Sequence, residues 1–155
     1  MGHYIQAVIA AQGVIEKTVP TIEGACCVPL GHGLAAMPIT SEVWDEVQQR
    51  PGVRCAMIPE GRLLRGSSAL YGLLTDISRM GPVIYVETEY FGGVGEQYAV
   101  VAENGAIVSF WEGDHPINKA LRTLGVEAEE GLDEFDTVGL GLTRSNEAMI
   151  ASTRG

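Results

Sequence analysis

The chain has 155 residues, of which 46% are hydrophobic and 19% are charged. This balance is typical of a folded globular chain and excludes intrinsic disorder, and no apolar run approaches the roughly 18 residues of a membrane span. The net charge of −10 disfavours binding to nucleic acids and anionic membranes, which are themselves negatively charged. We therefore expect a single globular domain over residues 1–155, and a cytoplasmic one, since no secretory signal pattern is visible.

The chain contains three cysteines, Cys26, Cys27 and Cys55, two of which are adjacent. An odd number of cysteines and a strained adjacent pair both argue against disulfides, so we expect reduced, buried thiols. Zinc sites need closely spaced ligands such as C-x-x-C, and the sequence has no such spacing. The sequence thus predicts neither a metal nor a cofactor.

The N-terminal segments are predicted to be mainly extended or irregular. Residues 4–11 form a short apolar run with β-branched side chains, which predicts a buried strand. Glycine and proline are frequent in residues 12–39, which predicts irregular coil or short edge strands. Residues 53–58 form another short run that could be a strand.

Two helices are predicted in the same half of the chain. Residues 40–52 form a short helix with Thr40 or Ser41 as its N-cap, ended by a Pro-Gly pair. Residues 66–82 form the clearest helix, capped by Ser67 or Ser68 and ended by Gly-Pro. Its apolar residues recur with helical spacing: Leu70, Leu73, Leu74 and Ile77.

Three consecutive strands follow, at residues 82–91, 97–103 and 106–111. The pair Asn104-Gly105 is typical of a tight type I′ hairpin. The outcome is an antiparallel three-stranded meander at about residues 82–111.

The C-terminal part is predicted to contain a helix at 114–126, an extended or looped stretch at 132–142, and a last helical turn at 145–152. The fold class is therefore α+β, a single domain with a largely antiparallel sheet and three to four short helices.

The Gly-rich stretch EYFGGVGEQYAVV at residues 89–101 is best explained as a hairpin. A dinucleotide-binding loop needs G-x-G-x-x-G between a strand and a helix, whereas this stretch has G-G-x-G followed by a strand. We expect Phe91 to open the turn and Gln97 to close it.

Glu87 and Glu89 share one face of the first meander strand, because strand side chains alternate. In the expected register, this face also carries Ala99 and Val101, and Glu96 lies at the rim. Paired carboxylates among apolar neighbours could act as acid and base. The opposite face is more uniformly apolar, so we expect it to form the core and Glu87 and Glu89 to be exposed; its members are Ile84, Val86, Tyr90, Tyr98, Val100 and Ile107.

Charge is unevenly distributed along the chain. Residues 80–147 hold thirteen acidic and three basic side chains, whereas residues 1–79 hold seven and six. A dense acidic cluster interleaved with apolar residues lies near the C-terminus, and such surfaces attract cationic partners. The predicted binding residues are Glu127, Glu129, Glu130, Asp133, Glu134, Phe135 and Asp136.

Three segments carry a resemblance: GPVIYVETEYFGGVGEQYAVV, PINKALRTLGV and DEFDTVGLGL. Over roughly residues 80–142, the chain resembles a family of small uncharacterised bacterial proteins of actinobacterial type. The resemblance implies a bacterial, intracellular origin and no activity or site residue.

The leading hypothesis is a non-enzymatic acidic protein that binds a basic partner, either an immunity-type protein or an accessory protein. The alternative is a small hydrolase or isomerase that uses Glu87, Glu89 or Glu96. A third hypothesis, suggested by the Ala- and Gly-rich N-terminal segment, is a self-assembling structural protein.

Overall fold

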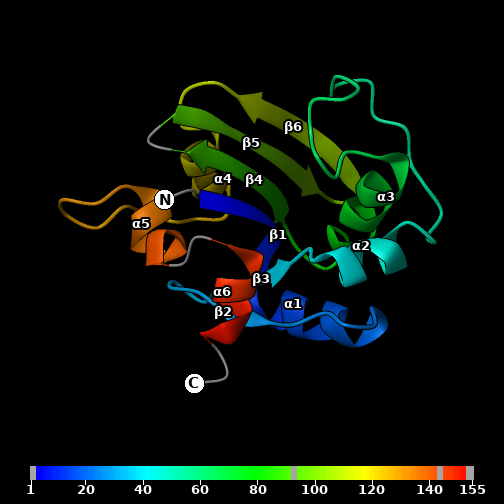
Figure 1. The fold of residues 1–155 in the computed structure, drawn as a ribbon, viewed down its shortest axis with the longest axis horizontal. Helices are drawn as coiled ribbons and strands as arrows, with labels where there is room; N and C mark the ends of the chain where they lie inside the picture. Colours follow the sequence, from blue (N-terminus) through cyan, green and yellow to red (C-terminus); the bar gives the residue numbers. More distant parts are fainter. Residues whose placement is uncertain (1–2, 92–93, 143–144, 153–155) are drawn as a thin grey trace.

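A six-stranded antiparallel sheet forms the centre of the molecule (Figure 1). The computed structural model describes residues 3–91, 94–142 and 145–152. The strands are β1 (His3–Ala11), β2 (Val28–Pro29), β3 (Leu34–Pro38), β4 (Val83–Phe91), β5 (Val94–Glu103) and β6 (Ala106–Glu112). Their order across the sheet is β2-β3-β1-β4-β5-β6. The predicted α+β class and the meander β4-β5-β6 are confirmed.

Helices cover both faces of this sheet. The first face, which we call face A, packs against helices from the first half of the chain: α1 (Gln12–Thr18), α2 (Ser41–Val47) and α3 (Ser68–Ile77). The second face, face B, packs against elements from the end of the chain: α4 (Pro116–Thr123), α5 (Glu134–Thr137), η2 (Leu140–Leu142) and α6 (Asn146–Ala151). A short 3-10 helix, η1 (Val19–Thr21), follows α1.

The central strands are therefore buried on both sides. In β1, Val8 and Ala10 belong to the core on face A, while Ala7 and Ile9 belong to the core on face B. Burial on both faces explains why residues 4–11 are almost continuously apolar, and the strand predicted there is confirmed.

Local capping signals predicted the helix starts correctly. The Thr40 side chain accepts a hydrogen bond from the Val43 N–H, and Ser67 accepts one from the Leu70 N–H. The Asn104-Gly105 turn has φ angles of 52° and 82°, as a type I′ turn requires. Helix α4 also forms where predicted, although no side chain caps its start.

Two predictions of irregular or extended structure were wrong, and a third was right only in part. Residues 12–39 contain short strands as predicted, β2 at the edge of the sheet and β3 inside it, but they also contain the helix α1, which was not predicted. Residues 53–58 are not a strand, because no sheet edge pairs with them. Residues 132–142 contain α5, whose N-cap Asp133 accepts a hydrogen bond from the Asp136 N–H, and η2.

The predicted hairpin register was also wrong. Phe91 pairs with Val94 rather than with Gln97, and Glu87 therefore lies opposite Tyr98; Gly92 and Gly93 lie outside the described residues. This shift is an odd number of residues, so it exchanges the two faces of β5 relative to β4. Glu87 shares face A with Tyr85 and Val100. Helices cover both faces of the sheet, and a core lies on each face. The more apolar face of the meander therefore does not mark the only buried side.

None of the described helices is long and apolar enough to cross a membrane.

Candidate functional site

A long irregular loop, residues 48–67, connects α2 to α3 and rises beside α3 at one end of the sheet (Figure 1). Loops of this length without secondary structure are uncommon in compact domains and often bind ligands. It carries four of the ten basic residues of the chain, namely Arg50, Arg54, Arg62 and Arg65.

The start of the loop is fastened to α3 through close approaches at two glycines. A Cβ atom added at Gly72 would lie 2.4 Å from the Pro51 carbonyl oxygen, and one added at Gly52 would lie 2.4 Å from the Ser68 hydroxyl oxygen. The N–H of Val53 donates to the Ser68 carbonyl at 2.9 Å. The backbone of the loop at residues 51–53 therefore packs directly against the start of α3.

The end of the loop is fastened to the sheet by Glu87. The carboxylate accepts hydrogen bonds from the N–H groups of Leu64 (2.8 Å) and Arg65 (3.0 Å) and from the Tyr85 hydroxyl (2.6 Å). Glu87 is only 5% exposed, so the expectation that it faces solvent was wrong. Its oxygens act as the anchor for a loop that has no sheet partner of its own.

Buried polar groups surround this anchor. Burial, followed by the neighbouring Glu87 carboxylate, raises the pKa of Tyr85 well above its usual value. The Arg65 guanidinium lies 5.5 Å from the centre of the Trp44 ring on α2, a distance suited to a cation–π contact. Sheet and helix thus hold the loop from two sides.

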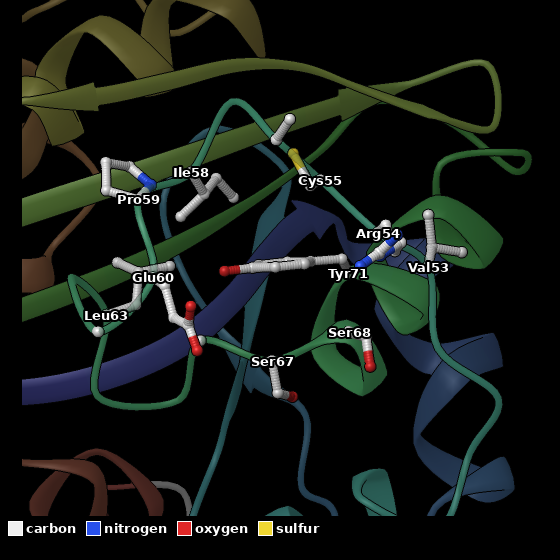
Figure 2. Close-up of a pocket in the computed structure, with 13 residues that line it drawn as sticks. Val53, Arg54, Cys55, Ile58, Pro59, Glu60, Leu63, Ser67, Ser68 and Tyr71 are labelled. Carbon is white, nitrogen blue, oxygen red and sulfur yellow. The ribbon is translucent and has the colours of Figure 1, made fainter.

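Beneath the loop lies a cavity of about 540 Å³, which we call the loop pocket (Figure 2). Its volume falls within the range of small-molecule sites. The walls come from the loop and from the first turn of α3. Its lining includes Arg54, Cys55, Ile58, Glu60, Leu63 and Tyr71.

Tyr71 forms the centre of the loop pocket. Figure 2 shows its ring extending across the cavity, with the hydroxyl pointing toward the stretch that carries Pro59, Glu60 and Leu63. The residue is only 9% exposed. Within the described residues its hydroxyl makes no hydrogen bond, and the oxygen is open to the cavity. Burial, then the proximity of Cys55 and Glu87, raises the Tyr71 pKa, so the hydroxyl stays protonated at neutral pH.

The three predicted carboxylates line a second, smaller hollow of about 220 Å³ on face A. Glu89 on β4 lies directly opposite Glu96 on β5, and both are exposed. Glu96 accepts a hydrogen bond from Tyr98, which raises the Tyr98 pKa to about 12. The structure brings Glu87, Glu89 and Glu96 together, but the Glu87 oxygens are already engaged by the loop.

The predicted acidic binding residues divide into two groups. Glu134 is buried and its Oε1 accepts a hydrogen bond from the Arg122 Nε at 2.8 Å, and Asp133 caps α5 and contacts Asn118. Phe135 is partly buried and packs against the core on face B. The remaining four are exposed: Glu127, Glu129, Glu130 and Asp136.

The three cysteines are free, as expected, but each is partly exposed rather than buried. Cys55 lines the loop pocket. Within the described part of the chain, no group of three or more His, Cys, Asp or Glu side chains could hold a metal ion.

Comparisons with protein-family models, with curated proteins and with solved structures gave no match. The predicted resemblance to small bacterial proteins therefore stays a prediction, and the functional argument depends on the site geometry.

Neither the loop pocket nor the role of Tyr71 was predicted from the sequence. Two signals were present: residues 48–67 combine several arginines with frequent Gly and Pro, and Tyr71 lies within the helix predicted at 66–82. Because residues 53–58 were predicted to form a strand, the length of the irregular loop was not recognised. An aromatic residue on a helix, such as Tyr71, is most simply explained as part of the hydrophobic core.

Proposed function

We propose that this protein binds a small organic molecule in the loop pocket and acts as a binding protein rather than an enzyme. The observation that carries the proposal is the placement of Tyr71: the residue is largely buried, its ring extends across the cavity, and its hydroxyl is open to the cavity and makes no hydrogen bond within the described residues. A hydroxyl that is open to a cavity and has no partner in the protein can donate a hydrogen bond to, or accept one from, a ligand atom.

The composition of the lining supports binding over catalysis. Apart from Tyr71, the buried lining residues are the apolar Ile58 and Leu63. Among the described residues that line the cavity there is no histidine beside Cys55 or Tyr71 to activate either as a nucleophile. Ligand sites typically combine such apolar walls with a few polar groups.

A fragment screen followed by crystal soaking tests this proposal. We expect several fragments to occupy the loop pocket of the wild-type protein and to contact the Tyr71 hydroxyl. In the variant Ala56→Trp, which places a large side chain into the lining, the same fragments should lose binding while the unfolding temperature stays unchanged. A screen that finds no fragment in this pocket, or equal binding to the filled variant, would overturn the proposal.

A second candidate function is the docking of a basic partner protein on the acidic C-terminal segment. It is favoured by the exposed carboxylates Glu127, Glu129 and Glu130, which lie near Leu132, 45% exposed. Among the described residues none of them forms an ion pair with lysine or arginine, and only Glu129 approaches a histidine, His32, at 3.8 Å. Immunity-type and accessory proteins fit this arrangement.

A phage-displayed library of random peptides tests this second candidate with a matched control. The target variant reverses the three carboxylates to lysine, and the control variant makes the same change at Glu16, Glu23 and Asp45, which are exposed elsewhere. We expect enriched peptides rich in Lys, Arg and apolar residues that lose binding only to the target variant. If the peptides lose binding equally to both variants, the effect is due to net charge, and docking of a basic partner on this segment is contradicted.

A further inference from the structure

We infer that the loop pocket is built for a zwitterion with an apolar body, such as a short peptide or an amino-acid derivative that carries one ammonium and one carboxylate group. This inference rests on the proposed function and adds the chemical class of the ligand. It follows from two opposite charges that line the same cavity, Arg54 and Glu60, with the Tyr71 ring extending between them (Figure 2).

The first end of the cavity favours an anionic group. Arg54 lies at the start of α3, because the N–H of the preceding residue, Val53, donates to the Ser68 carbonyl. Within the described residues Arg54 forms no ion pair with any carboxylate of the protein. Helix α3 has ten residues, and its N-terminal amides add partial positive charge at this end.

The opposite end favours a cationic group. In Figure 2 the Tyr71 hydroxyl points toward the stretch that contains Glu60. A Cβ atom added at Gly66 would lie 3.1 Å from the Tyr71 hydroxyl oxygen, so the chain passes close to the hydroxyl here. Glu60 also has no ion-pair partner in the described part of the chain. An ammonium group at this end could donate to both the Glu60 carboxylate and the Tyr71 oxygen.

The middle of the cavity is apolar. Ile58 and Leu63 are buried in its wall, and the Tyr71 ring extends across it. A ligand that lies along the ring would therefore place its hydrocarbon part between its two charged groups. The one arginine and one glutamate of the lining also argue against a polyphosphate, which would need several cations and no carboxylate.

A set of three dipeptides tests the inference. The probes are Leu-Phe with free termini, its N-acetyl form, which lacks the ammonium group, and its C-terminal amide, which lacks the carboxylate. Isothermal titration calorimetry with the full chain should show that free Leu-Phe binds best, and that each modified form binds about tenfold more weakly or worse, because a charge-assisted hydrogen bond is lost.

Two variants then assign each charge to one end of the ligand. Arg54→Gln should weaken binding of free Leu-Phe about tenfold but leave binding of the amide form unchanged, because that probe has no carboxylate to lose. Glu60→Gln should weaken free Leu-Phe similarly and leave the N-acetyl form unchanged. Arg50→Gln is the control, since Arg50 pairs with Asp76 and does not line the cavity.

The outcomes separate the two proposals. If fragments occupy the loop pocket but the three dipeptides bind equally, or Arg54→Gln and Glu60→Gln change nothing, the zwitterion class is wrong while the binding function stands. If neither fragments nor dipeptides occupy the pocket, the binding function itself is overturned.

Discussion

The Tyr85 hydroxyl donates a hydrogen bond of 2.6 Å to the carboxylate of Glu87, two residues further along the same face of β4. The same carboxylate accepts the N–H groups of Leu64 and Arg65. A polar pair inside the sheet thus determines where the loop ends, and with it the shape of the loop pocket.

Glu87→Gln is expected to lower the free energy of unfolding by about 2 kcal/mol, because an amide has one acceptor oxygen and would turn its NH₂ group toward a backbone N–H. Urea unfolding monitored by circular dichroism measures the change. Glu89→Gln, on the same strand but exposed, should change stability by no more than about 0.5 kcal/mol. Equal effects of the two substitutions would contradict the anchoring role of Glu87.

Tyr85→Phe should change the pH dependence of stability. The folded-state pKa of Tyr85 is raised, so above the unfolded value of about 10 the unfolded chain releases this proton while the folded chain retains it. Wild-type stability therefore falls as the pH rises through this range, and the variant lacks this loss. At neutral pH the variant should be less stable by about 1 kcal/mol, and the difference should narrow between roughly pH 9.5 and 11. A constant difference across this range would refute the expectation.

Gly72→Ala should destabilise the protein although Gly72 lies inside a helix. Alanine normally stabilises a helix interior by about 0.5–1 kcal/mol relative to glycine. Here the added Cβ atom would lie 2.4 Å from the Pro51 carbonyl oxygen, so helix and loop must separate. Gly13→Ala in α1 is the matched control, since no atom lies within 4 Å of its added Cβ. The unfolding temperature should fall for Gly72→Ala and rise for Gly13→Ala. A rise in both variants would rule out the close packing of Gly72 against Pro51.

Asn146→Ala should loosen the attachment of α6 to β1. The Asn146 side chain accepts the Gln6 N–H at 3.1 Å and donates to the Ile39 carbonyl at 3.1 Å, and it is 5% exposed. Its removal leaves two buried backbone groups without this partner, at a cost of about 1–3 kcal/mol. Hydrogen exchange should accelerate in residues 146–151 and at Gln6. Unchanged exchange at Gln6 would contradict the role of this side chain.

Much of the local structure could be predicted from the sequence because it depends on neighbouring residues. Ser67 caps α3 through a bond to the N–H three residues later, and Asn104-Gly105 turns the chain through its own φ angles. The loop pocket could not be predicted in this way. Residues 53–58 have the composition of a strand, but a strand forms only where another strand offers hydrogen bonds.

The sequence by itself determined the α+β class, the main helices, the meander and the concentration of acidic residues in the second half of the chain. Only the tertiary structure decided the register of β4 against β5, and therefore that Glu87 lies under the loop rather than in solvent. Only the tertiary structure placed Arg54, Glu60 and Tyr71 around one cavity. The physical reason is separation along the chain. Caps and turns form between residues a few positions apart, whereas the β4-β5 register pairs residues as far apart as Val83 and Ala102, and the Glu87 carboxylate holds backbone groups more than twenty positions away.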